Sequence, residues 1–350
     1  MRAMIENYRN LPAGHCGSGA MRNLIYHYTG LELDEGVVFG LGAGLDSVFF
    51  TYEQAKPPFM LFGRGSSMEV DLAETLGMDY SEQAEPDNDK AWADVREAVL
   101  AGKPTMLSGD ILYLDYREFK VHFPAHRFVL LGFDEEREEV YIADRVRAEP
   151  ETCSMQALRL SRNPPEAIST FNAWGQFTSG SVRHSLPDAC GLALYKTVTR
   201  MHGMDHSQLD LMGAAQGGGG HEIAVGLKGL LTFSRHLHSW RQLDDATDHV
   251  RYVDNAIIKY GTGGGFFRNH FAVFMSWARE QRPDLVSIVT EQLAHQAAVL
   301  WNDLSPTMQQ LAERPGEEAL WQQAEAQVDD IYETEYSLFG HLGDTVLRTG

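Results

Sequence analysis

The spacing of apolar residues changes near residue 150 of this 350-residue chain. Before that point, short apolar runs typical of strands alternate with segments in which apolar residues recur every three or four positions, as on one face of a helix. After it, helical spacing dominates, and the breaks fall at glycine and proline residues. The pattern predicts an α+β fold, with a first domain at residues 1–155 and a mainly helical second domain at residues 156–350.

A β-hairpin is the clearest element of the first domain. Two apolar runs, at residues 125–134 and 139–144, are joined by a charged turn at residues 135–138. Other strands are expected at 59–62 and 104–114, and helices at 20–28, 68–76, 89–101 and 154–160. In the second domain, helices are expected at 188–201, 222–243, 247–260, 266–280, 283–304 and 317–338. Gly40, Gly42 and Gly44 lack the spacing of a dinucleotide-binding fingerprint, which favours a tight packing loop.

The composition disfavours several classes of partner. A formal net charge of −20 argues against nucleic acid and anionic membrane surfaces, because both attract clustered Lys and Arg. Three widely spaced cysteines without a CxxC pair do not indicate a disulfide framework or a zinc site, and the histidine spacing of a metal motif is absent, so no metal is expected. The first residues lack the apolar region of a signal peptide, and no run approaches the ~18 apolar residues of a membrane span. We therefore expect a cytoplasmic protein.

Cys16 is the candidate nucleophile. It lies between a segment broken by Pro and Gly and the helix predicted at 20–28, and the amino end of a helix favours thiolate over thiol. His126 opens the first strand of the hairpin and Asp144 closes the second, and these two ends lie side by side in an antiparallel pair. A base and its orienting acid require that placement. The alternative is a small buried cysteine, a structural histidine and a turn-capping aspartate.

The chain order of Cys16, His126 and Asp144 resembles that of papain-like enzymes. There the nucleophile lies on an N-terminal helix, and the base and its orienting residue follow on later strands. Papain-like enzymes also carry a side-chain amide six residues before the cysteine, which helps the cysteine's own N–H to bind the oxyanion. Asn10 holds that position here, so the resemblance implies an oxyanion-binding role for Asn10.

Further motifs give the chain a resemblance to the butirosin biosynthesis protein H family. In chain order they are Gly14-His15-Cys16, FGLGAG at 39–44, FGR at 62–64, the segments 110–116 and 126–134, and YGTGGGFFR at 260–268. The helical half resembles the uncharacterised domain that usually follows the N-terminal domain of this family. The resemblance implies a papain-like fold and an acyltransferase of specialised metabolism, which moves an aminoacyl group from an acyl carrier protein thioester to a small-molecule amine. It implies no cofactor of its own, because the phosphopantetheine belongs to the carrier protein.

Two features are candidates for donor recognition. Gly261, Gly263 and Gly264, followed by Arg268 in the first turn of the next predicted helix, form a pattern that can bind an anionic group such as the phosphopantetheine phosphate. The alternative is a packed turn between two helices. The arginines at positions 145, 147, 159 and 162 are a candidate docking patch for a carrier protein, or else ordinary surface residues. The helical domain is expected to serve as lid and acceptor side.

Three functions agree with these residues. The first is cysteine-dependent acyl transfer from a thioester to an amine through a Cys16 acyl-enzyme. A cysteine peptidase, amidase or thioesterase would use the same residues if water reached the acyl-enzyme. A binding module with a relic site would have a Cys16 of ordinary reactivity.

Overall fold

The computed structural model describes residues 1–53, 55–124, 126–165, 169–205 and 222–348. The chain forms two compact units, each made from two segments: residues 1–35 with 77–183, and residues 36–76 with 184–350. The expected boundary at 155/156 differs from this division in two respects. Residues 36–76 contribute two strands to the sheet of the second unit, and the strand at 174–177 belongs to the sheet of the first.

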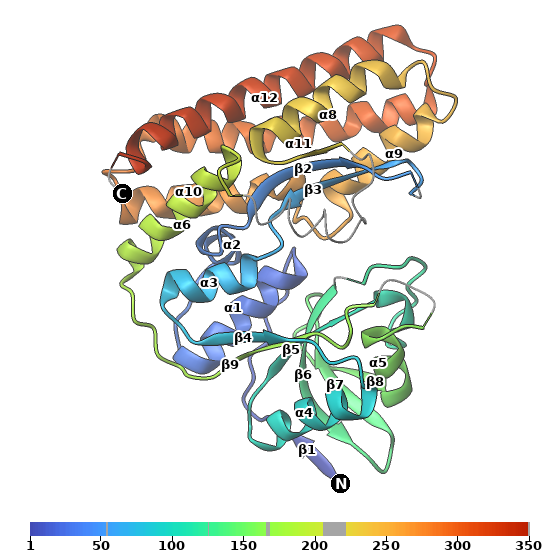
Figure 1. The fold of residues 1–350 in the computed structure, drawn as a ribbon, viewed down its shortest axis with the longest axis vertical. Coiled ribbons are helices and arrows are strands. Elements are labelled where there is room, and N and C mark those ends of the chain that lie inside the picture. The colour runs from blue at the N-terminus through green and yellow to red at the C-terminus, as the bar shows by residue number, and fades with distance from the viewer. Residues whose placement is uncertain (54, 125, 166–168, 206–221, 349–350) are drawn as a thin grey trace. The chain divides into compact units, whose positions relative to one another are not determined.

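The first unit is built on an antiparallel sheet with seven strands in its described residues (Figure 1). The strands are β1 (Arg2–Met4), β4 (Tyr80–Gln83), β5 (Thr105–Gly109), β6 (His126–Asp134), β7 (Glu139–Ala143), β8 (Glu151–Ser154) and β9 (Trp174–Phe177). Their order is β4-β9-β5-β6-β7-β8, and β1 pairs with the last residues of β6. The predicted hairpin is β6–β7, in which Phe133 pairs with Val140. A β-bulge between Leu130 and Gly132 shifts its register.

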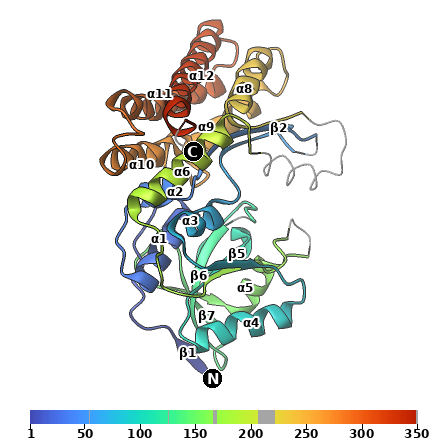
Figure 2. The ribbon, with the colours of Figure 1, turned by 60° about the vertical axis from the view of Figure 1, so that its left-hand side comes forward.

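Helices cover both sides of this sheet. α1 (Cys16–Thr29) packs against β6, whereas α4 (Asn88–Leu100) and α5 (Met155–Arg162) pack through a core that includes Val95, Phe128 and Leu158. Figures 1 and 2 show α1 on one side of β6 and α4 and α5 on the other. A short 3-10 helix, η1 (Ile111–Tyr113), follows β5.

α1 begins four residues before the predicted start at residue 20. His15 has the extended conformation of an N-cap, and its side chain accepts the main-chain N–H of Ser18. The helix ends at Gly30, whose φ of +74° is in the left-handed region that glycine adopts without a Cβ penalty. The cap therefore makes Cys16 the first residue of the helix.

The second unit combines a small sheet with long helices. In its described residues, β10 (Ile223–Ala224), β2 (Leu45–Thr51) and β3 (Phe59–Arg64) form an antiparallel sheet in that order. The other elements are α2 (Glu35–Leu41), α3 (Met68–Leu76), α6 (Leu186–Met201), α8 (Gly226–Trp240), α9 (Ala246–Ile258), η2 (Gly265–Phe267), α10 (Arg268–Gln281), α11 (Ile288–Glu313) and α12 (Glu318–Val346). The helices predicted after residue 186 are confirmed with shifted ends. Strand β3 agrees with the strand predicted at 59–62, but its assembly into a small sheet with β2 and β10 was not predicted.

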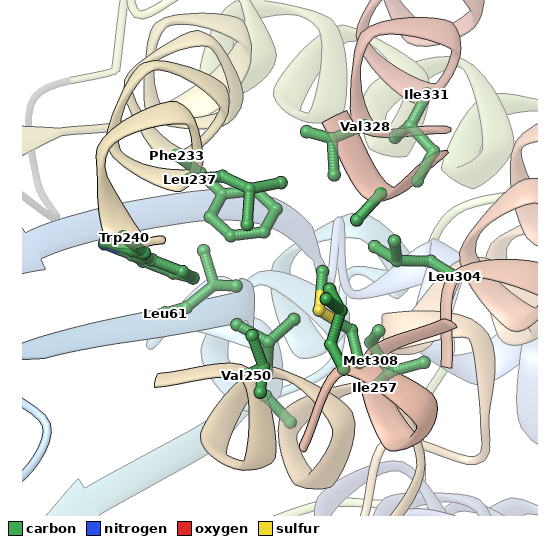
Figure 3. Close-up of a cluster of buried hydrophobic side chains, with 14 of the residues drawn as sticks. Leu61, Phe233, Leu237, Trp240, Val250, Ile257, Leu304, Met308, Val328 and Ile331 are labelled. Atoms are coloured by element: carbon green, nitrogen blue, oxygen red, sulfur yellow. The ribbon is translucent and has the colours of Figure 1, made fainter. Parts of the chain in front are cut away.

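One face of the small sheet and four helices share a large apolar core (Figure 3). Leu61 of β3, Trp240 of α8, Val250 of α9, Met308 of α11 and Ile331 of α12 all point into it and are almost completely buried. Full burial of one such side chain contributes roughly 1.5–3 kcal/mol, so this core stabilises the second unit substantially.

The glycines at 40, 42 and 44 are required by close packing. A Cβ on Gly40 would lie 1.9 Å from the Phe274 ring, and one on Gly42 would lie 2.6 Å from the Met68 carbonyl oxygen. The prediction of a packing segment is confirmed, although residues up to 41 are helical. Among the described residues, no helix combines the length and apolar character that crossing a membrane requires.

Candidate active site

The turn before α1 is held by a carboxylate and an imidazole. Glu35 accepts the main-chain N–H groups of Gly14 and His15 at 2.9 and 2.8 Å. His15 Nδ1 accepts the N–H of Ser18 at 3.1 Å, and the Ser18 hydroxyl donates to Glu35 at 3.0 Å. These contacts fix Cys16, which is 6% exposed, at the amino end of the helix.

His126 and Asp144 meet at the edge of the sheet, as the hairpin pattern predicted. His126 is the first residue of β6, Asp144 directly follows β7, and both are buried. His126 Nε2 lies 2.9 Å from Asp144 Oδ1. The other ring nitrogen, Nδ1, is the one left for the hydrogen bond between His126 and Cys16. The structure thus brings the predicted nucleophile, base and orienting acid together within the first unit.

The three groups shift one another's protonation. Burial alone would raise the pKa of Cys16, but the neighbouring His15 and His126 outweigh it and hold that pKa well below its usual range. Burial alone would lower the pKa of His126, but Asp144 and Cys16 raise it to about 10. Burial opposes ionisation of Asp144, yet His126 and hydrogen-bond donors hold its pKa below the usual range. All three directions favour the charged form of the group concerned.

Asp144 has two further donors. The Arg145 main-chain N–H donates to Oδ1 at 2.7 Å, and the Tyr116 hydroxyl donates to Oδ2 at 3.0 Å. Sequence reasoning missed Tyr116 as a site residue, although it lies in the segment 110–116 that supports the family resemblance. It also missed Glu35, because nothing in the spacing links a residue at the start of α2 to the turn before Cys16.

The contacts of Asn10 do not fit the predicted oxyanion role. Its Nδ2 donates to the main-chain carbonyl oxygens of Asp144 at 2.8 Å and Arg147 at 2.5 Å, so both amide protons are used. Its Oδ1 accepts from Asn23 of α1 at 2.7 Å. Arg145 reinforces the same connection, because its carbonyl oxygen accepts the Ala13 N–H at 2.7 Å. Asn10 therefore ties the turn before Cys16 to the turn that carries Asp144.

Two family models cover most of the chain. The model of the N-terminal domain of butirosin biosynthesis protein H matches residues 15–145, and a domain of unknown function, DUF4872, matches residues 156–342. The chain belongs to the butirosin biosynthesis protein H family. The curated proteins provide no match.

The N-terminal family model spans Cys16, His126 and Asp144, and it also includes His15 and Tyr116. Asn10 lies outside it. The match to DUF4872 begins at residue 156, near the boundary expected from the sequence. Cys16, His126 and Asp144 therefore all belong to the butirosin H domain, and the glycine loop at 261–265 belongs to the domain of unknown function.

Arg268 does not fit the predicted anion-binding role. It is 1% exposed, and its guanidinium binds both carboxylate oxygens of Glu335 at 2.8 and 2.7 Å. The other donors reach the Asp46 and Phe266 carbonyl oxygens and the Ser47 hydroxyl. An arginine whose charge is already neutralised in the core has no donor for a ligand.

The glycine loop before Arg268 has the properties of a packed turn between helices. Gly261, Gly263 and Gly264 all have φ between +70° and +86°. A Cβ on Gly263 would lie 2.1 Å from His270 Nε2. The glycines are therefore explained by backbone conformation and close packing.

The four arginines after Asp144 do not form one exposed patch. Arg162 is buried and donates to the Asn172 carbonyl oxygen, and Arg159 pairs with Asp89. Arg162 therefore cannot belong to the docking patch expected at these positions, and docking of a carrier protein at the other three stays a prediction. Within the described ranges, the structure has no group of three or more His, Cys, Asp or Glu side chains arranged to hold a metal ion.

Proposed function

We propose that the first unit is a papain-like catalytic domain that transfers an acyl group from a thioester to an amine through Cys16. The observation that carries the proposal is the buried Cys16 at the amino end of α1, hydrogen-bonded to a histidine that Asp144 orients. A cysteine helix packed against an antiparallel sheet supports the papain-like assignment. The biosynthetic family to which the chain belongs supports a synthetic rather than a degradative role.

In the first half-reaction, the Cys16 thiolate attacks the carbonyl carbon of the thioester. A C–S bond to Cys16 forms and the C–S bond to the donor thiol breaks. The departing thiolate takes a proton from the His126 imidazolium. Exchange between two thiolates of similar leaving ability has a small barrier, so the acyl-enzyme forms readily.

In the second half-reaction, the amine nitrogen attacks the acyl-enzyme. His126 accepts a proton from the attacking amine, the C–N bond forms, and the C–S bond to Cys16 breaks. The products are an amide and the resting thiolate–imidazolium pair. Throughout both steps, Asp144 keeps the imidazole in one orientation and stabilises its charged form.

The proposed donor is an acyl carrier protein or another acyl thioester, and the proposed acceptor is a small-molecule amine. The amine is favoured by the net charge of −20, since a field of that sign raises the local concentration of cationic ligands. The chain is proposed to need no cofactor, because the donor brings its own phosphopantetheine.

Intact mass spectrometry after exposure to acyl thioesters tests this function. We expect an acyl adduct on Cys16 that a supplied amine discharges as an amide. Cys16→Ala should abolish the adduct, whereas Cys190→Ala is the matched control, because burial raises the pKa of Cys190 to about 12. An adduct that water discharges equally fast would identify a thioesterase or amidase instead. An unmodified Cys16 with every donor would contradict the proposal.

A further inference from the structure

The second half-reaction releases more protons than His126 can take up. At neutral pH a primary alkylamine is an ammonium ion, since its pKa is about 10, as for lysine. The ammonium carries three protons and the amide nitrogen keeps one, so two protons have to leave. His126 takes one of them, which replaces the proton that it gave to the donor thiol. The other proton needs a second acceptor that is in contact with water, and His126 is buried.

A second histidine–carboxylate pair occupies the loop between β5 and β6. Asp110 directly follows β5, and its Oδ2 lies 2.8 Å from His122 Nδ1. The Asp110 side chain is fully buried, whereas the His122 side chain is 54% exposed. Histidine is the side chain that most often transfers protons near neutral pH. An exposed imidazole that a buried carboxylate holds in place is therefore suited to passing a proton from a bound molecule to water.

Asp110 is itself held by main-chain groups on both sides of the loop. Its Oδ1 accepts the N–H of Leu112 at 3.1 Å and the N–H of Phe123 at 2.9 Å. Its own main-chain N–H donates to the Ser161 carbonyl oxygen at 2.8 Å. The carboxylate is thus fixed in position, and it engages Nδ1 of His122. Exchange of a proton between this ring and another molecule therefore takes place at Nε2.

The loop lies at the end of the sheet that carries the catalytic set. Gly109, the last residue of β5, pairs with His126, the first residue of β6. Because the Cα atoms of such a pair lie about 5 Å apart, Asp110 begins beside the main chain of His126. The same loop contacts the catalytic acid, since the Tyr116 hydroxyl donates to Asp144. Both histidine–carboxylate pairs therefore lie at one end of one sheet.

We propose that His122 is a second general base, which takes one proton from the ammonium form of the acceptor. The inference rests on the proposed function and deepens its second half-reaction. His122 Nε2 accepts the proton, and the electron pair of the broken N–H bond becomes the lone pair that attacks the acyl-enzyme. His126 then takes the second proton, and His122 releases its own to bulk water. Asp110 is the positioning residue of this pair. The acceptor class is an alkylamine that is cationic at neutral pH.

The test compares two amines of similar size and different charge in the full chain. The Cys16 acyl-enzyme is discharged at pH 7 either by ethylamine, which is cationic, or by trifluoroethylamine, which is largely uncharged and needs no second base. The variant is His122→Asn, because the asparagine Nδ2 can still donate to Asp110 but cannot take up a proton. The matched control is His238→Asn, since His238 is also about half exposed and its Nδ1 lies 3.4 Å from a Glu325 carboxylate oxygen.

We expect His122→Asn to slow discharge by ethylamine at pH 7 on the order of 100-fold, and discharge by trifluoroethylamine by less than about twofold. The loss with ethylamine should shrink as the pH approaches 10, because the amine then loses its proton to the solvent. Formation of the Cys16 adduct should be unchanged, and His238→Asn should behave as the wild type in every measurement.

Two results would overturn the inference. One is discharge by ethylamine at pH 7 that is as fast in His122→Asn as in the wild type. The other is an equal loss with both amines at every pH, which would give His122 a structural role only. A wild-type chain that forms no adduct, or whose adduct neither amine discharges, would instead refute the proposed function of Cys16.

Discussion

Asp144→Asn removes a charge while leaving the geometry of the site in place. The asparagine oxygen can still accept from His126 Nε2 and from the Arg145 N–H. The asparagine NH₂ would face the Tyr116 hydroxyl, which can rotate from donor to acceptor. What is lost is the negative charge behind the imidazole. The substitution therefore isolates the electrostatic contribution of Asp144 to the state of His126 and Cys16.

The size of the effect follows from the distance. With 2.9 Å between the nitrogen and the oxygen, the two charge centres lie about 4 Å apart, and at an effective dielectric constant of about 20 they attract by about 4 kcal/mol. That energy corresponds to about 3 pKa units. Asp144 is thus the larger cause, ahead of Cys16, of the rise in the pKa of His126 from an ordinary value of 6.5 to about 10, which occurs although burial opposes the charged form. Without Asp144, the pKa of His126 should fall to its ordinary value or below.

Neutral His126 no longer stabilises the Cys16 thiolate, so the pKa of Cys16 should rise in Asp144→Asn. We expect iodoacetamide alkylation at pH 6 to slow on the order of 100-fold, and acyl transfer to slow by about 10²–10⁴. The assay is the alkylation rate from pH 4 to 10, with circular dichroism to verify folding. Asp134→Asn is the control, since Asp134 is a buried carboxylate at the other end of β6. An alkylation profile in folded Asp144→Asn equal to that of the wild type would refute the reasoning.

Four further outcomes are expected. Because the pKa of His126 is raised to about 10, the folded protein keeps a proton that the unfolded chain loses above pH 6.5. The stability that protonated His126 contributes is therefore complete below pH 6.5 and is lost as the pH rises towards 10. Urea denaturation at several pH values should detect this loss in the wild type but not in His126→Gln. Tyr116→Phe should slow alkylation at pH 6 by about tenfold, because it deletes a donor to an ionised carboxylate. Asn10→Ala leaves two main-chain carbonyl groups without their donor, so urea denaturation should give a loss of about 1–3 kcal/mol, together with reduced turnover. Arg268→Met leaves the buried Glu335 unpaired and should cost about 3–5 kcal/mol in the same assay, most of which the added change Glu335→Gln should restore.

The spacing of apolar residues was sufficient to predict the helices and strands that are long or strongly amphipathic. The helices after residue 186 and the hairpin β6–β7 could be predicted because each has many apolar positions in one repeat. Strands β4, β8, β9 and β10 have between two and four residues, too few for alternation to be distinguished from chance. The association of residues 36–76 with the second unit depends on long-range contacts, such as Phe274 against Gly40, which no local pattern encodes.

For the functional residues, the sequence predicted which ends of two strands lie side by side. It did not predict which charged side chains form buried ion pairs. His126 and Asp144 could be brought together because antiparallel pairing puts the start of one strand beside the end of the next. Arg268 looked available beside a glycine loop, yet Glu335, 67 residues away along the chain, takes up its charge. Burial and pairing of a charge depend on tertiary packing, so a charged residue beside a glycine loop indicates an anion site only when no buried partner lies within reach.

The residue misassigned from the sequence explains how the site keeps its geometry. Cys16 and Asp144 lie far apart in the sequence, and each is next to a turn, since Cys16 begins α1 and Asp144 directly follows β7. Turns hold their positions less well than helices or strands. Asn10 compensates by donating to the Asp144 and Arg147 carbonyl oxygens, and Arg145 donates back to the Gly14 carbonyl oxygen. The link acts on main-chain atoms of both turns, so any displacement of one turn displaces the other with it. The distance from sulfur to carboxylate, with the imidazole between them, is therefore determined by hydrogen bonds that touch none of the reacting atoms, and this is why Asn10 can matter to the chemistry without binding the oxyanion.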